Sequence, residues 1–174
     1  RLIPPVWHDE GTWTNPFGTD AMGRDYLSRV IYGARISLII GVATAIISGV
    51  IGSALGITAG YFGGRVDMVI SLIITTRLSL PVILVALAVV AIIGASLHIV
   101  IAVLGLLLWD RFAVVMRSAT MQARSLDYVA AASAIGASTP RIIVSEILPN
   151  IMNNLIVVAT FEVANAILLE AALS

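Results

Sequence analysis

The sequence predicts an all-α fold, a polytopic transmembrane helical bundle. Of its 174 residues, 59% are hydrophobic and 11% are charged, and the mean hydropathy is +1.03. Water-soluble domains carry about a quarter charged residues. Residues 36–64 contain no charged side chain, and roughly 20 apolar residues in a helix span the core of a bilayer. The chain is therefore expected to cross a lipid bilayer several times.

Composition also excludes several function classes. All ten basic residues are arginine and ten acidic residues balance them, so net charge indicates no nucleic-acid partner. The chain has no lysine, which a G-x-x-x-x-G-K-[ST] phosphate-binding loop requires, and no cysteine for a disulfide or a thiolate metal site. The adjacent His8, Asp9 and Glu10 on an irregular segment cannot converge on one ion. We expect no enzyme activity and no catalytic, cofactor or metal site in this chain.

The first 35 residues are expected to lie outside the bilayer. Residues 15–20 predict a turn, and residues 24–34 predict a short amphipathic helix along the membrane surface. Asp25 and Arg29 are expected to form an i,i+4 ion pair on its polar face.

Residues 36–174 are expected to form the transmembrane domain. Four spans are predicted, at about 36–59, 68–93, 99–115 and 151–169. The small and polar residues 94–98 separate the second span from the third. Four spans would place Arg1 and Ser174 on the same side. Arginines cluster near the third connection, which would lie on the opposite side. This excess favours the side of the third connection as cytoplasmic.

A stripe of small residues follows one face of the first span and includes Gly52, Gly56 and Gly60. Because lipid gives no hydrophobic drive between helices, such a stripe predicts close helix packing. The neighbouring helix could belong to this chain or to another.

Arg77 and Glu162 are the charged residues most clearly placed inside predicted spans. A charge at mid-bilayer costs about 2.5–3.5 kcal/mol, so each should face protein or a water-filled cavity. At about 1.5 Å per residue, Arg77 lies about 15 Å beyond Asp67 and Glu162 about 20 Å beyond Pro149. The hypothesis is that the two pair, or line a translocation path, near the middle of the membrane. Alternatively, Arg77 extends to the near interface.

Residues 124–150 predict an ordered connection between spans. An alanine-rich helix begins at Asp127 and ends at Gly136, which can adopt the left-handed conformation that closes a helix. Thr139 is then a candidate N-cap, with Pro140 at the first helical position. The prediction is two short helices joined at an angle.

The segment Asp127-Tyr128-Val129-x-Ala131-Ala132-x-x-x-Gly136-Ala137-Ser138, followed by Arg141-Ile142-Ile143 and Ile147-Leu148-Pro149-Asn150, resembles the EAA loop of ABC importer permeases. The resemblance implies a type I importer fold, in which the first short helix is a cytoplasmic coupling helix docked in a cleft of an ATPase subunit. The residues implied in coupling are Asp127, Tyr128, Ala131, Ala132, Gly136, Ala137 and Ile142. The usual glutamate of the loop is Ala130 here, so small residues rather than one ion pair should make the contact.

Residues 16–38 and 59–64 resemble the dipeptide, oligopeptide and nickel branch of these permeases, and residues 170–174 resemble the start of a further motif. By this resemblance the four spans are the second to fifth of the family. It implies a multi-pass permease of the bacterial plasma (inner) membrane that forms half of a pathway for peptides or a related solute, a nickel chelate included.

The same resemblance implies the partners. They are two ABC ATPase subunits that carry ATP and Mg, a second homologous permease, an extracytoplasmic solute-binding protein, and the lipid bilayer. A secondary transporter or ion-conducting subunit that uses Arg77 and Glu162 is an alternative. A structural membrane subunit is another. Neither alternative explains the ordered helix pair at residues 127–150.

Overall fold

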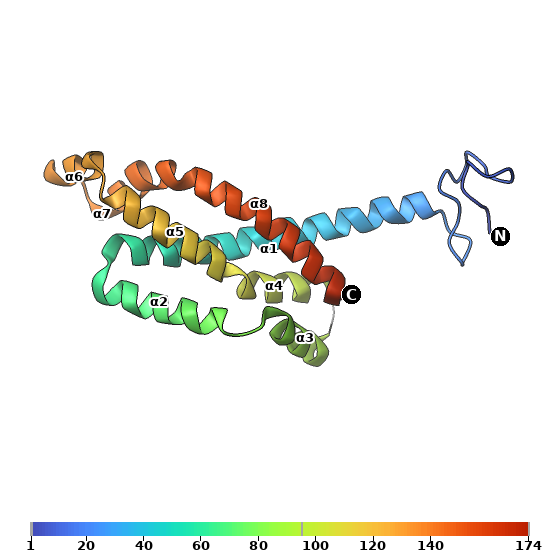
Figure 1. The fold of residues 1–174 in the computed structure, drawn as a ribbon, viewed down its shortest axis with the longest axis horizontal. Coiled ribbons are helices and arrows are strands. Elements are labelled where there is room, and N and C mark those ends of the chain that lie inside the picture. Colours follow the sequence, from blue (N-terminus) through green and yellow to red (C-terminus); the bar gives the residue numbers. More distant parts are fainter. Residues whose placement is uncertain (1, 95, 174) are drawn as a thin grey trace. The chain divides into compact units, whose positions relative to one another are not determined.

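The computed structural model describes residues 2–94 and 96–173, and its regular elements are helices (Figure 1). In chain order these are α1 (Tyr26–Phe62), α2 (Gly64–Leu78), α3 (Val82–Ile93), α4 (Leu97–Leu107), α5 (Trp109–Arg124), α6 (Asp127–Ala134), α7 (Thr139–Arg141), the π-helix η1 (Ile142–Ile147) and α8 (Leu148–Leu173). The prediction of an all-α fold is confirmed. The chain divides into two compact units, Arg1–Ile39 and Ile40–Ser174.

Asp20 organises the loop of the first unit. Its carboxylate accepts hydrogen bonds from the backbone N–H groups of Met22 and Arg24, each at 2.9 Å. It also pairs with Nε of Arg24 at 3.0 Å and with Nη1 of Arg29. These donors, the Arg24 backbone N–H foremost, lower the pKa of Asp20 to about 2.

Asp25 caps the start of α1. Its Oδ2 accepts the Ser28 backbone N–H at 2.8 Å and the Ser28 hydroxyl at 2.5 Å, while its Oδ1 accepts the Asn15 amide at 3.1 Å. Such a cap satisfies a donor that the first helical turn leaves unpaired. The predicted pair between Asp25 and Arg29 is therefore wrong, since Asp25 acts as the cap and Arg29 pairs with Asp20.

The expected surface helix at residues 24–34 is not a separate element, because α1 continues without a break from Tyr26 to Phe62. At about 1.5 Å per residue, these 37 residues are longer than a bilayer core of about 30 Å requires.

In the second unit, the glycines of α1 meet the backbone of α5. A Cβ atom added to these glycines would lie too close to carbonyl oxygens of α5, at 2.2 Å for Gly52 to Trp109, 2.5 Å for Gly56 to Ala113 and 2.6 Å for Gly60 to Arg117. Real Cβ atoms do not approach so closely, so only glycine allows this packing. The stripe therefore faces a helix of this chain.

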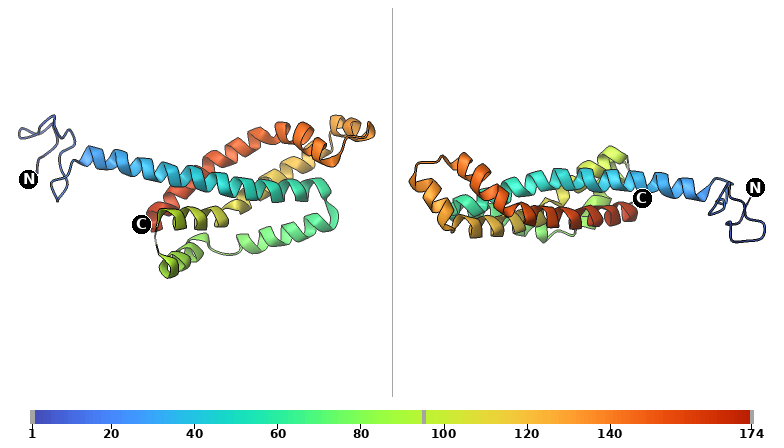
Figure 2. Two further views of the ribbon diagram at one scale, coloured as in Figure 1. Left: turned by 180° about the vertical axis from the view of Figure 1, so that it is seen from behind. Right: turned by 90° about the horizontal axis from the view of Figure 1, so that it is seen from above.

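After Phe62 the chain turns back, and α2 runs opposite to the second half of α1 (Figure 2). Arg117 of α5 binds both carboxylate oxygens of Asp67 in α2, with Nη2 to Oδ2 at 2.6 Å. A two-point contact between guanidinium and carboxylate fixes orientation as well as distance. It ties α2 to α5 near the turn.

The expected span at 68–93 is broken. Residues 79–81 separate α2 from α3, and the two helices are bent by 75°. Pro81 has no backbone N–H and disfavours a helical conformation at Leu80, which accounts for the break. Among the described residues, three helices are long and apolar enough to cross a membrane, at Tyr26–Phe62, Leu97–Arg124 and Thr139–Leu173. The bent pair makes a fourth if it is one span.

The last two expected spans also differ in extent. The third, expected at 99–115, runs from Leu97 to Arg124 with an irregular residue at Leu108. The fourth, expected at 151–169, begins at Thr139, because α7, η1 and α8 follow one another directly. Of the predicted boundary at 94–98, Gly94 ends α3 with φ of 108° and Ser96 precedes α4, while Ala95 lies outside the described residues, as do Arg1 and Ser174.

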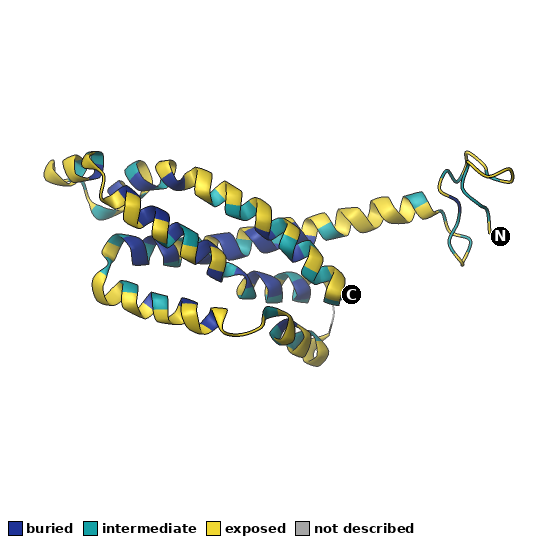
Figure 3. Ribbon diagram, viewed as in Figure 1, coloured by how far each residue is buried: buried dark blue, intermediate teal, exposed yellow. Residues whose placement is uncertain are grey.

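Burial follows this packing. Buried residues gather on α4, on α5 and on the second half of α1, whereas much of α8 is exposed (Figure 3).

We expect Gly56→Ala to destabilise the protein by about 1–3 kcal/mol, because the new methyl group would overpack against the backbone of α5. The matched control is Gly33→Ala in the same helix, where no atom lies within 4 Å of the added Cβ. The control should be neutral or stabilising, since alanine favours helix over glycine. Thermal unfolding of the detergent-solubilised protein measures both, and equal midpoints for the two variants would contradict the packing.

Asp20 should make the loop of the first unit sensitive to acid. Its folded pKa lies below the ordinary value of 3.8, so its contacts stabilise the loop above that pH and are lost as the pH falls toward about 2. Pepsin should therefore cut residues 2–25 of the wild type progressively faster over this range. Asp20→Asn should be cut rapidly already at about pH 4. Similar cleavage of both proteins at that pH would count against the role of the carboxylate.

Candidate functional site

A paired hydrogen-bond closure ends α6. The Gly136 N–H donates to the Ser133 carbonyl at 3.0 Å, and the Ala137 N–H donates to the Ala132 carbonyl at 3.1 Å. Gly136 has φ of 83°, the left-handed conformation that this closure requires. The N-cap position of the next helix is Ser138, one residue before the expected Thr139; its side chain makes no capping hydrogen bond, and Pro140 lies within α7. The turn between the two helices is therefore fixed by its own backbone.

A buried apolar cluster anchors α6 to the end of the bundle. It joins residues of α1, α5, α6, η1 and α8, namely Ile57, Met116, Ala119, Ala123, Val129, Ile142, Ile147 and Ile151. Val129 is the member from α6 and is 5% exposed. Full burial of such a side chain contributes about 1.5–3 kcal/mol. The segment is thus packed onto the bundle.

The residues predicted to make the coupling contact divide into an outer and an inner set. Asp127, Ala131 and Gly136 are exposed, whereas Tyr128, Ala132 and Ala137 are half-buried and Ile142 is buried. The half-buried three pack against the apolar cluster, so they position α6 and leave the exposed three available to a partner.

The exposed face includes residues that the sequence did not single out. Ala130, Ala134 and Ile135 are exposed beside Ala131, and Ile135 is 87% exposed. A large apolar residue directly before the glycine that ends a helix was the signal that could have identified Ile135. The outer face of α6 is therefore mostly small and apolar, with the charged Asp127 at its start and the large apolar Ile135 directly after its end.

Two hollows flank α6. One, of about 380 Å³, is lined by Tyr61, Phe62, Arg124, Val129, Ala130, Ser133 and Thr139. The other, of about 250 Å³, is lined by Ala132, Ile135, Gly136, Ala137, Arg141, Ile142 and Glu146. Each contains an arginine, but the second also contains Glu146, so the charge of Arg124 in the first hollow is the one without an acidic residue among the lining residues.

Glu162 pairs with Arg111, a residue that sequence reasoning did not consider for this role. Glu162 is 1% exposed, and its Oε1 accepts a hydrogen bond from Nη1 of Arg111 at 3.0 Å. The Asn165 amide donates to Oε2 at 3.3 Å. The hypothesis that Glu162 pairs with Arg77 is therefore wrong, since α5 supplies the partner.

Arg77 instead bridges two helix breaks. Its Nη1 donates to the Leu80 carbonyl at 3.3 Å and its Nη2 to the Leu107 carbonyl, at the ends of α2 and α4. Carbonyls at helix ends lack intrahelical donors, which makes them acceptors for a guanidinium. Arg77 is 9% exposed, so these two carbonyls and the surrounding helices enclose its side chain.

A hollow of about 430 Å³ lies between α5 and α8 at the ion pair, and Leu78, Arg111, Phe161 and Glu162 are among its lining residues. Leu78 follows Arg77 in the chain and lines the same hollow as Glu162. Arg77 and Glu162 therefore lie at a similar depth along the bundle, although they do not pair. The role of this level in translocation remains a prediction.

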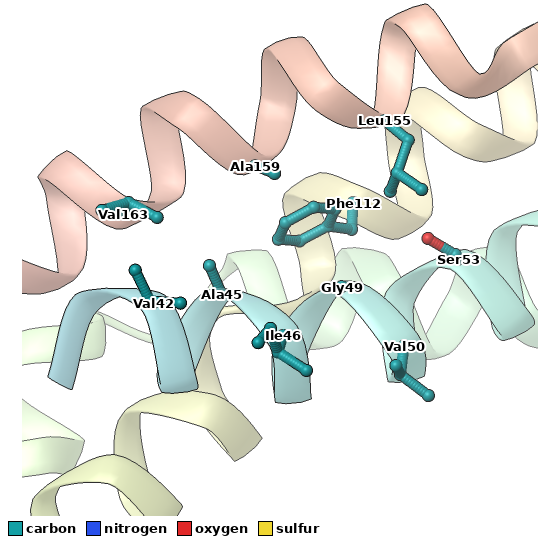
Figure 4. Close-up of a pocket in the computed structure, with 10 residues that line it drawn as sticks. All are labelled: Val42, Ala45, Ile46, Gly49, Val50, Ser53, Phe112, Leu155, Ala159 and Val163. Carbon is teal, nitrogen blue, oxygen red and sulfur yellow. The ribbon is translucent and has the colours of Figure 1, made fainter. Parts of the chain in front are cut away.

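A second hollow of about 430 Å³ is apolar and lies between α1 and α8 (Figure 4). Val42, Ala45 and Gly49 line it from α1, while Ala159 and Val163 line it from α8, with Phe112 of α5 at the side. It carries no charged lining residue among those described, so it suits apolar contacts rather than chemistry.

The chain is similar to membrane components of known transport systems. Residues 52–174 match the family described as binding-protein-dependent transport system inner membrane component. The chain is 37% identical over 167 residues to the dipeptide transport system permease protein of Haemophilus influenzae, covering 96% of this chain and 57% of that protein.

It is 40% identical over 172 residues to the di/tripeptide transport system permease protein of Pseudomonas aeruginosa, covering 99% of this chain and 57% of that protein. It is 41% identical over 158 residues to the dipeptide transport system permease protein of Bacillus subtilis, covering 91% and 49%. The chain thus spans about half the length of these relatives.

Arg111→Ala should destabilise the protein by about 1–3 kcal/mol, because it leaves the buried Glu162 carboxylate without its cation. The Arg111 side chain is 57% exposed, which keeps the effect in the lower part of that range. Adding Glu162→Gln should restore most of the lost stability, because it removes the unpaired buried charge. Thermal unfolding of the two variants in detergent measures this, and a double variant less stable than Arg111→Ala would contradict the pairing.

Proposed function

Since this chain belongs to the family of binding-protein-dependent transport system inner membrane components, we propose that it forms half of the translocation pathway of a bacterial ATP-driven ABC importer. Peptides are the proposed solute, because the similar proteins of Haemophilus influenzae and Pseudomonas aeruginosa are named for dipeptides and for di- and tripeptides. A nickel chelate is a further solute of the same branch. The proposed location is the inner membrane, crossed several times.

The observation that carries the proposal is the outer face of α6. A docking helix must be held rigidly and must let another backbone approach closely. The closure at Gly136 and the buried Val129 meet the first requirement. The exposed Ala130 and Ala131 meet the second, because small side chains add little between two backbones. We infer that α6 couples this chain to one of two ABC ATPase subunits. ATP and Mg would bind to those subunits and not to this chain.

Charge supports a cytoplasmic position for α6. Arg65, Arg124 and Arg141 lie at the turns nearest to it, and an excess of arginine is typical of cytoplasmic connections. On this orientation residues 1–35 lie outside the cytoplasm, on the side where a solute-binding protein would deliver its cargo.

A second permease is proposed from the exposure of α8. Only 11% of the most apolar stretch of Thr139–Leu173 is buried, although this helix is apolar enough to cross a membrane. Its exposed residues include Asn153 and Asn154. Polar side chains within a span face protein or water rather than lipid. A second, homologous permease and the solute path between the two chains would cover them.

The ion pair of Arg111 and Glu162 between α5 and α8 is proposed to line that path. Arg111 is half-exposed beside the buried Glu162, and a guanidinium at mid-membrane needs water or protein around it. Arg77, at a similar level, is proposed to hold the wall of the path rather than to contact the solute.

The proposal predicts that Ala131→Trp blocks docking. In the assembled importer, the larger side chain should weaken retention of the ATPase subunits about tenfold, which corresponds to about 1.4 kcal/mol. The matched control is Ala21→Trp, at an exposed alanine in the N-terminal loop. Quantitative co-purification of ATPase with the tagged permease is the measurement, together with solute-stimulated ATP hydrolysis. Equal retention by the two variants would overturn the assignment of this face.

A further inference from the structure

Arg124 is held in place at the junction of three helices. It is the last residue of α5, and its Cζ lies 5.7 Å from the centroid of the Tyr61 ring in α1. A cation over an aromatic face is attracted by the ring quadrupole. Gly63 has φ of 64°, and a Cβ added to it would lie 3.4 Å from Nη1 of Arg124. The guanidinium is thus positioned beside the turn that follows α1.

The larger of the two hollows beside α6 has a charged residue in its lining. Among the described residues that line it, Arg124 is the charged one, and Ser133 of α6 and Thr139 of α7 supply hydroxyl groups. Ala130 is also part of the lining, and its methyl group leaves the space of about 380 Å³ open. A cation with two hydroxyl donors forms a site for an anionic group.

The guanidinium suits a carboxylate in particular. It presents five N–H donors in a planar fork that matches the two oxygens of a carboxylate. The ion pairs found between described residues use Arg24, Arg29, Arg111 and Arg117, and Arg124 is in none of them. Its charge is therefore available to a group from outside this chain.

The position of the hollow identifies the source of that group. Ala130 and Ser133 belong to α6, whose outer face is the proposed docking surface. Ala130 and Ala131 are both exposed on α6, so the opening of the hollow beside Ala130 borders the proposed docking surface. A basic hollow within a docking surface favours an acidic side chain on the partner.

We propose that the Arg124 hollow receives an aspartate or glutamate side chain of the docked ATPase. This inference rests on the proposed function, because it takes the partner of α6 to be an ATPase. The ion pair would set the orientation of docking, while the small apolar face of α6 provides close contact.

The test compares charge variants in the assembled importer. Arg124→Glu should weaken retention of the ATPase at least about tenfold, because like charges would meet in the hollow. Arg124→Lys should weaken retention less than Arg124→Glu does, since it keeps the charge, but should not match the wild type, because it loses the fork that pairs with two carboxylate oxygens. The matched control is Arg65→Glu, which makes the same charge change at an exposed position outside the hollow. Retention is measured by co-purification over a series of salt concentrations.

A second variant approaches the hollow from the other side. Ser133→Glu would place a carboxylate of this chain beside Arg124 and compete with the partner. It should weaken retention, and combining it with an acid-to-lysine change on the ATPase should restore binding. Crosslinking from Arg124→Cys to cysteines introduced at acidic positions of the ATPase identifies the residue to change.

The outcomes separate the two levels of the argument. If the wild type retains no ATPase, the proposed function fails. If the wild type retains it and Arg124→Glu behaves as Arg65→Glu does at every salt concentration, only the inference about the hollow fails. Equal losses with Arg124→Glu and Arg124→Lys, independent of salt, would likewise overturn an ionic contact. Retention that depends on anionic lipid instead of an ATPase acid would assign the hollow to a lipid phosphate.

Discussion

The close approach of α1 to α5 is the contact on which the rest of the second unit depends. Three glycines at a spacing of four residues let one helix lie against the backbone of the other. Because lipid does not drive helices together, such contacts rely on packing between surfaces that fit. Once α5 is fixed, it carries Arg117 to Asp67, Arg111 to Glu162, and Arg124 to the hollow beside α6.

The charges within the membrane domain follow from the same arrangement. Arg77 and Arg111 both lie close to places where a helix is interrupted, after α2 and at Leu108. A broken helix exposes carbonyls that need donors, and Arg77 supplies two of them. Arg111 lies in the first turn of α5, directly after the irregular Leu108, and there it pairs with Glu162.

Sequence reasoning succeeded where the structure depends on the local backbone. Gly136 closes α6 because only glycine adopts that conformation readily, and the glycine stripe of α1 could be identified from its spacing. It failed where the outcome depends on helix rotation. Depth along the membrane could be counted from residue numbers, but whether Glu162 faces Arg77 or Arg111 depends on how three helices are turned.

The break at Pro81 shows a related limit. Residues 68–93 form an apolar run long enough to span, and hydropathy averages over the one proline that interrupts it. The same averaging missed the start of the last span at Thr139, where polar residues precede the apolar run. The outer and inner sets of α6 could not be separated either, because an alanine-rich helix has little amphipathic pattern from which to predict its buried face.

The continuity of the last span gives the proposed coupling a physical route. The helix that begins at Thr139, three residues after the closure of α6, continues to Leu173 and contains Glu162. Counting about 1.5 Å per residue, Glu162 lies about 35 Å along it from Thr139. The irregularity between them is the π-helix Ile142–Ile147, whose Ile142 and Ile147 are packed into the cluster that holds Val129. If a partner displaces α6, as proposed, this helix is the element that would carry the displacement toward the contact between Glu162 and Arg111.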